Sequence, residues 1–161
     1  MQMDARQIPY EGEFDVVGAF DVIEHIEEDR QVLASMARAL RPRGGLLVTV
    51  PQHPWLWSAA DDYACHVRRY TKRELHEKIE GAGLRVVRST SFVSLLLPAM
   101  LASRRRASIG TRFDPVDELR IGPLVNRALE TVLRAEVGMI RMGMSFAAGG
   151  SRLVVAVKPG A

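Results

Sequence analysis

Residues 14–20 read Phe-Asp-Val-Val-Gly-Ala-Phe, and residues 40–51 read Leu-Arg-Pro-Arg-Gly-Gly-Leu-Leu-Val-Thr-Val-Pro. The apolar runs at 14–19 and 46–50 are typical of strands that a parallel sheet buries on both faces. Between them, apolar residues recur at helical spacing after the acidic group at 27–29, which favours a helix amino terminus. Pro42 and the glycines at 44 and 45 predict the end of that helix. This stretch therefore predicts a strand–helix–strand unit.

The rest of the chain continues this alternation. Thr71 and Glu74 have the spacing of a capping box, which predicts a helix that ends at Gly83. Strands are predicted at 84–90 and 153–157. Between these strands we expect an apolar helix or hairpin-like cover at 91–102, a mobile segment at 103–119, and an amphipathic helix from Pro123. The pattern predicts an α/β fold with a mainly parallel sheet, helices on both faces, and ligands at the carboxyl ends of the strands.

The composition excludes several classes of protein. The 161 residues suit one domain, and 47% apolar with 25% charged residues argues against disorder. The formal charge of +3 is not accompanied by a stripe of interleaved basic and aromatic residues, so no nucleic-acid partner is expected. Cys65 is the single cysteine, which fits a cytoplasmic location. The longest apolar stretch, 91–102, is shorter than the roughly 20 residues that span a bilayer.

Three segments carry a family resemblance when they are taken in their order and spacing. They are residues 14–17, residues 21–26 (Asp-Val-Ile-Glu-His-Ile) and residues 40–51. Together they resemble the middle of class I S-adenosylmethionine (SAM) dependent methyltransferases, in particular the group related to ubiquinone-biosynthesis O-methyltransferases. The resemblance implies a Rossmann-like sheet whose last strand is antiparallel, with 91–145 as a variable helical insertion. It also implies methyl transfer from SAM to a small-molecule acceptor.

The chain departs from this family at its amino-terminal side. The glycine-rich loop that lets the cofactor approach the backbone is absent, as is the acidic residue that holds the ribose. We therefore expect residues 1–161 to be one amino-terminally truncated methyltransferase domain that binds SAM weakly or not at all. The strand at 14–19 would lie at an exposed edge, which predicts self-association or capture of the missing amino-terminal half. The alternative function is a catalytically inactive half-domain that associates with a partner or with itself.

The resemblance assigns cofactor contacts to two places. Asp4 and Ala5 would follow the family's third strand, where an acidic side chain and the next backbone amide read the adenine ring. Phe20 and Asp21, in the turn after the strand at 14–19, would also contact the cofactor. The alternative for Asp4 is a solvated residue in a frayed terminus.

Asp21, Glu24 and His25 have the spacing i, i+3 and i+4, which places three side chains on one face of a helical turn. Two carboxylates and an imidazole suit a divalent ion such as Mg²⁺ or Mn²⁺. The resemblance implies the same metal role. Two alternatives remain open: Glu24 and His25 cap the turn, or His25 is a general base, assisted by Glu24 at the acceptor.

The long segment at 52–70 holds the candidate substrate residues. His53, Trp55 and Trp57 would form a substrate wall or lid, with core packing as the alternative. Arg69 and Tyr70, with neighbouring basic residues, could bind an acidic substrate group, although a solvated basic helix entry is the favoured interpretation. Residues 91–106 join an apolar stretch to three arginines, which predicts peripheral membrane contact.

Overall fold

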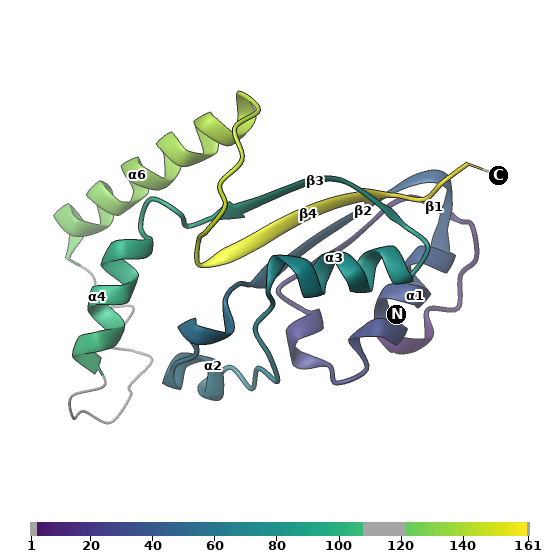
Figure 1. The fold of residues 1–161 in the computed structure, drawn as a ribbon, viewed down its shortest axis with the longest axis horizontal. Coiled ribbons are helices and arrows are strands. Elements are labelled where there is room, and N and C mark those ends of the chain that lie inside the picture. Colours follow the sequence, from purple (N-terminus) through teal and green to yellow (C-terminus); the bar gives the residue numbers. More distant parts are fainter. Residues whose placement is uncertain (1–2, 108–121, 161) are drawn as a thin grey trace.

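The computed structural model describes residues 3–107 and 122–160, and the side chains of 3–103 and 122–160. The strands are β1 (Phe14–Phe20), β2 (Leu40–Pro51), β3 (Arg85–Phe92) and β4 (Ser151–Val157). The α-helices are α1 (Asp29–Ala39), α2 (Ala59–Tyr63), α3 (Lys72–Gly81), α4 (Leu97–Ala107) and α6 (Pro123–Arg141). Three short 3₁₀ turns are η1 (Ala5–Gln7), η2 (Ile23–His25) and η3 (Pro54–Leu56). Figure 1 shows their arrangement.

The four strands form one mixed sheet in the order β1-β2-β4-β3. β1 pairs with β2 in parallel, whereas β4 is antiparallel to both β2 and β3. The prediction of a mainly parallel sheet is therefore wrong, since one of the three neighbouring pairs is parallel. The reason is the path of the chain. Ser151, the first residue of β4, pairs with Phe92, the last residue of β3, so β4 must run antiparallel to β3. The predicted antiparallel last strand is confirmed.

Helices α1 and α3 lie along the same face of the sheet (Figure 1). The core between these helices and the sheet consists of buried apolar side chains from α1, β2, α3 and β4. They are Val32, Leu33, Met36, Leu46, Val48, Val50, Leu75, Ile79, Val154 and Ala156. On the opposite face, Leu47 and Val155 are paired neighbours and only half-buried. Helices on both faces were predicted. On the face away from α1 and α3, Arg88, the β3 partner of Val155, donates to the carbonyl of Ile140 in α6, and most of α4 and α6 extends past that end of the sheet (Figure 1).

β1 is an outer strand of the sheet, and most of its side chains are exposed. Its side chains at Val16 and Phe20 are each 60% exposed, and Ala19 is its single buried residue. The interpretation of residues 14–19 as a strand buried on both faces is wrong, because no described strand pairs with the outer edge of β1. The prediction that this strand is an exposed edge is confirmed.

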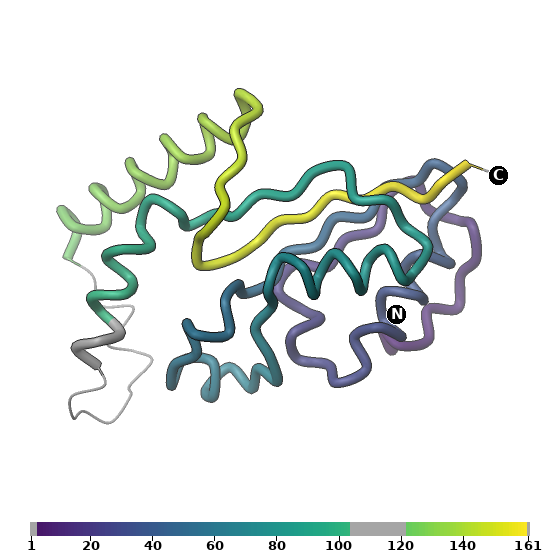
Figure 2. The backbone as a smooth tube through the Cα atoms, viewed as in Figure 1, coloured from purple at the N-terminus to yellow at the C-terminus, as the bar shows by residue number. Residues whose placement is uncertain are grey.

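The predicted cap at Thr71 is confirmed. The Thr71 side chain accepts a hydrogen bond from the Glu74 amide at 3.1 Å, so α3 begins where the capping pattern placed it. Residues 52–70, predicted to be irregular, contain η3 and the short α2, and Asp61 accepts from the Ser58 amide at 2.9 Å to start α2. Figure 2 traces this segment from the end of β2 back to α3 on the face that the helices cover.

Polar contacts tie α6 to β3 and to the residues that follow β3. Buried Glu136 of α6 accepts hydrogen bonds at 2.8 Å from the amides of Ser94 and Leu95, and Arg88 of β3 donates to the Ile140 carbonyl. Leu124, at the start of α6, is 85% exposed. Of the mobile segment predicted at 103–119, residues 108–119 lie outside the described residues. No helix in the described part of the chain has both the length and the apolar character that crossing a bilayer requires.

Candidate functional site

The candidate site lies where β1 and β2 end. Because these strands are parallel, the segments that follow them leave from the same edge of the sheet. Backbone hydrogen bonds hold this region together: the Asp21 amide donates to Thr49, the Val67 amide to the Glu24 carbonyl at 2.8 Å, and the Tyr70 amide to Pro51 at 3.0 Å. The end of β1 is thus fastened both to β2 and to the returning segment at 65–70.

Glu24 is a fully buried acid in η2. Neither of its carboxylate oxygens has a hydrogen-bond partner among the described residues. Burial raises the pKa of the Glu24 carboxyl to about 7, and the nearby charge of Asp21 contributes to the rise. An unpaired buried carboxylate is costly, so this residue requires an explanation that packing alone does not give.

Two histidines lie beside Glu24. The rings of His25 and His66 meet edge to face, with their centroids 4.8 Å apart. One ligand atom from each of Glu24, His25 and His66 lies within 4.8 Å of the other two. Sequence reasoning had placed Asp21 in this group instead of His66. Asp21 is exposed, in the left-handed region at φ 51°, and among the described residues it does not join the cluster.

Both rings have their Nδ1 atoms near oxygen acceptors. The Nδ1 of His66 lies 2.9 Å from Asp61 Oδ1, and that of His25 lies 3.4 Å from the Cys65 carbonyl oxygen. Burial opposes ionisation of Asp61, but hydrogen bonds from Arg69 and His66 outweigh it and lower the pKa of that carboxyl. Asp61 therefore remains an acceptor, and the Nδ1 of His66 is the donor.

Arg69 is buried, and both of its contacts are internal. Its Nε donates to Asp61 Oδ1 at 2.7 Å and its Nη1 to the Gln52 carbonyl at 3.1 Å. The favoured interpretation of this region as a solvated basic helix entry is wrong for Arg69 and Tyr70, which are 8% and 0% exposed. The interpretation failed because a run of basic residues gives no sign of the acids that fold against it from other elements.

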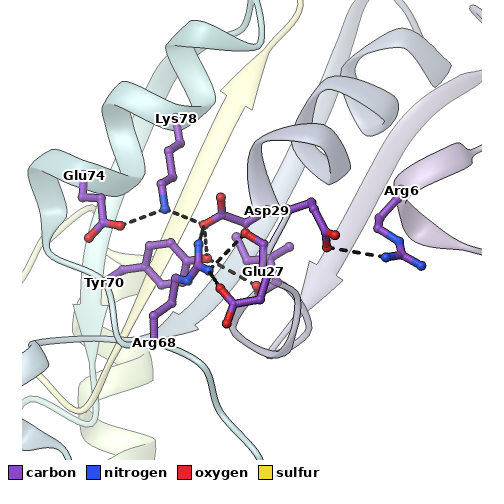
Figure 3. Close-up of polar contacts among 9 residues, drawn as sticks. Arg6, Glu27, Asp29, Arg68, Tyr70, Glu74 and Lys78 are labelled. Atoms are coloured by element: carbon purple, nitrogen blue, oxygen red, sulfur yellow. Dashed lines mark hydrogen bonds and ion pairs between the residues drawn. The ribbon is translucent and has the colours of Figure 1, made fainter.

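Tyr70 belongs to a second buried network, shown in Figure 3. Its hydroxyl donates to Asp29 Oδ2 at 2.7 Å, and the same oxygen accepts from Arg68 at 2.6 Å and from Lys78. Glu74 also pairs with Lys78, at 2.8 Å. These contacts join the start of α1 to α3 and to the segment after η3. The substrate role of Arg69 and Tyr70 stays a prediction, and both side chains already have internal partners.

The predicted adenine contact lies near His25. Asp4 caps η1 and its carboxylate accepts hydrogen bonds from the amide and the guanidinium of Arg6, each at 2.9 Å. An open hollow of about 420 Å³ lies between η1 and the end of η2. It is lined by Asp4, Arg6, His25, Ile26, Glu27 and Glu28. Ala5 begins η1. Phe20 ends β1 and Asp21 follows it, and neither residue lines this hollow.

The aromatic residues after β2 form an exposed surface. Trp55 is 61% exposed and stacks at a tilt on His53, with ring centroids 5.0 Å apart. Trp57 is also exposed and donates to Asp62 at 3.0 Å. Core packing is therefore wrong for both tryptophans. Burial and the charges of Arg152 and Arg69 lower the pKa of His53.

Sequence reasoning missed Arg152. This side chain is 1% exposed within the apolar β4 run, and it donates to Ser89 at 2.8 Å, to Ser91 at 2.9 Å and to the Ala147 carbonyl at 2.8 Å. Burial lowers the pKa of its guanidinium. The sequence does indicate this burial. Arg152 directly precedes the Leu-Val-Val run, and strand alternation places it on the same face as the buried Val154 and Ala156.

The chain can now be compared with known proteins. A methyltransferase domain family matches residues 2–89. No curated protein matches the chain. Solved structures with a similar fold include the [4+2]-cyclase SpnF, at 21% identity and a TM-score of 0.56, covering 99% of this chain and 55% of the other.

Two further similar structures bear on the cofactor and on partners. One is a putative methyltransferase from Haloferax volcanii in complex with the Trm112 methyltransferase activator, at 17% identity and a TM-score of 0.58, covering 98% and 60%. The other is Haemonchus contortus phosphoethanolamine N-methyltransferase 2 in complex with SAM, at 19% identity and a TM-score of 0.55, covering 97% and 36%. The chain thus spans less than two thirds of the length of these structures. It belongs to the methyltransferase domain family and shares the Rossmann-like fold of class I SAM-dependent methyltransferases.

Proposed function

We propose that this chain provides the acceptor side of a SAM-dependent methyltransferase that acts on a small molecule. The observation that carries the proposal is the orphaned carboxyl of Glu24, buried beside His25 at the end of β1. Perturbed acids of this kind concentrate at functional sites. Similarity to a phosphoethanolamine N-methyltransferase bound to SAM supports the cofactor but leaves the acceptor open.

The chemistry requires little of the protein beyond alignment and removal of a proton. When bound, SAM would supply an electrophilic sulfonium methyl group to the acceptor. His25 is exposed and lines the hollow next to Asp4, so its imidazole can take the acceptor proton. The carboxylate of Glu24, within 4.8 Å of the ring, stabilises the imidazolium that forms. Asp4 would orient the cofactor at the other end of the hollow.

A second function has its own supporting observation. Val16 and Phe20 are exposed on β1, whose outer edge pairs with no strand among the described residues, and the similar structures are much longer than this chain. A half-domain that pairs through β1 with a second polypeptide, or with another copy of itself, would cover that edge. The Haloferax volcanii protein is bound to an activator, which supports a role for partner binding. Membrane contact through 91–106 would modify either function.

Two measurements test the catalytic proposal. In calorimetric titrations, we expect the isolated chain to bind SAM no more tightly than high micromolar, because it lacks the glycine-rich loop. Submicromolar affinity would show that the remaining contacts suffice.

The second measurement uses an active methyltransferase that contains this segment. There, Glu24→Gln is expected to lower kcat at least tenfold and to leave the Kd for SAM within about twofold. Asp15→Asn, an exposed carboxylate on β1, is the matched control. Turnover equal to wild type in Glu24→Gln would remove Glu24 from the mechanism.

A further inference from the structure

The sequence predicts a magnesium site, and that metal role stays a prediction. Its three residues were Asp21, Glu24 and His25, but the cluster that the fold assembles contains Glu24, His25 and His66. Mg²⁺ prefers oxygen ligands in near-octahedral geometry. A set of two imidazoles and one carboxylate instead matches the ligands of zinc and of other divalent transition metals.

The burial of Glu24 supplies an independent indication of a ligand. Both of its oxygens are inaccessible and lack hydrogen-bond partners among the described residues, although they lie beside two imidazoles. A cation held between these groups would satisfy the carboxylate. Ligand atoms bound to one zinc ion lie about 3–4 Å apart, given bonds of about 2.0–2.2 Å. The three ligand atoms, which lie within 4.8 Å of one another, would therefore have to move only slightly closer together to bind one ion.

The surroundings of the histidines prepare them as metal ligands. A metal-bound imidazole usually donates its second ring nitrogen to a carboxylate or a backbone carbonyl. His66 has Asp61 as that partner at 2.9 Å, and His25 has the Cys65 carbonyl at 3.4 Å. Donation from each Nδ1 leaves Nε2 as the atom with a free lone pair. Asp61 is fixed in turn by Arg69 and Ser58.

We propose that Glu24, His25 and His66 bind one divalent transition-metal ion of the zinc type, with Asp61 orienting His66. Three protein ligands leave one coordination position open, as in catalytic rather than structural zinc sites. His25 also lines the hollow that Asp4 lines, so the proposed ligand set borders the proposed acceptor site. With the ion bound, the Nε2 of His25 is a ligand and cannot take the acceptor proton, so the metal-bound state is an alternative to the general-base role of His25 and Glu24 proposed above. Metal binding by this chain can be measured without methyl transfer.

The test is a zinc titration of the isolated chain after treatment with a chelator. All variants carry Cys65→Ser, because an exposed thiol could bind zinc by itself. We expect one ion per chain, with affinity lowered about tenfold or more by His66→Gln and by Glu24→Gln. Asp21→Asn and His53→Gln are controls, since one belongs to the predicted set and the other is a nearby histidine outside the cluster. Both should retain affinity within about twofold.

A spectroscopic measurement covers the case in which a variant fails to fold. Co²⁺ bound to the Cys65→Ser chain should show visible absorption of a low-coordinate nitrogen and oxygen site, and stoichiometric Zn²⁺ should displace it. Zinc should also raise the melting temperature of this chain but not that of His66→Gln. Absence of stoichiometric binding, or loss of binding in Asp21→Asn with His66→Gln unaffected, would overturn the assignment.

Discussion

The hydroxyl of Tyr70 donates a 2.7 Å hydrogen bond to Asp29, which joins the segment entering α3 to the first residue of α1. Both side chains are buried, and Lys78 lies 4.9 Å from the centre of the Tyr70 ring. Arg68 and Lys78 share the same carboxylate oxygen of Asp29 (Figure 3). This network fixes the two helices that cover the sheet, and it therefore holds the return of residues 65–70 to the candidate site.

Tyr70→Phe removes one hydrogen bond to a buried carboxylate and keeps the shape of the ring. We expect it to lower the free energy of unfolding by about 2 kcal/mol, since hydrogen bonds to charged groups are worth more than neutral ones. Urea denaturation measures the change. In an Asp29→Asn background the same substitution should cost clearly less, because the two residues are in contact. Equal costs in both backgrounds would show that the bond contributes nothing to stability.

Asp29 predicts how stability depends on acid pH. Burial alone would raise the pKa of this carboxyl, but hydrogen bonds from Lys78 and Tyr70, with nearby cations, outweigh burial and lower the pKa below 3.8. A lowered pKa means that the unfolded chain binds the proton first. The contribution of Asp29 is therefore present above pH 3.8 and lost as the pH falls through the lower folded-state value.

Asp29→Asn should thus destabilise the chain by about 3 kcal/mol at neutral pH, because Lys78 and Arg68 lose their shared partner. The loss should shrink below pH 3.8. Asp15→Asn, whose side chain is 81% exposed in the wild type, serves as the control and should change stability by less than about 0.5 kcal/mol. Melting curves from pH 2 to 7 separate the two variants, and a constant difference for Asp29→Asn across that range would contradict the linkage.

The exposed edge of β1 predicts how the chain associates. Val16→Lys places a charge on an outward-facing position of that edge strand, where charged side chains prevent pairing between sheets. We expect the variant to be monomeric by light scattering at micromolar concentration, whereas the wild type associates. Stability should change by no more than about 0.5 kcal/mol.

The opposite edge of the sheet offers a matched control. Val87→Lys makes the same change at an exposed position of β3, the other outer strand. It should leave association unaltered if β1 is the interface. A wild-type chain that is strictly monomeric under these conditions would exclude association through either edge.

The sequence by itself determined the local elements. Apolar runs gave the strand cores at 14–19 and 46–50, and Thr71 with Glu74 gave the start of α3, because strand and helix periods and caps depend on neighbouring residues. It also placed Glu24 and His25 after the first strand, at the edge of the sheet where ligands bind. Those features need no knowledge of how distant segments meet.

The tertiary structure decided which distant residues meet. β4 inserts between β2 and β3. It begins beside the last residue of β3 and runs antiparallel to both neighbours, so the sheet is mixed. His66, 41 positions after His25, lies beside Glu24 because the Val67 amide bonds to the Glu24 carbonyl, whereas Asp21, at a left-handed turn, is not part of this cluster among the described residues. Such contacts depend on hydrogen bonds between backbone segments that are distant in the sequence, and local hydrophobic periodicity carries no information about them.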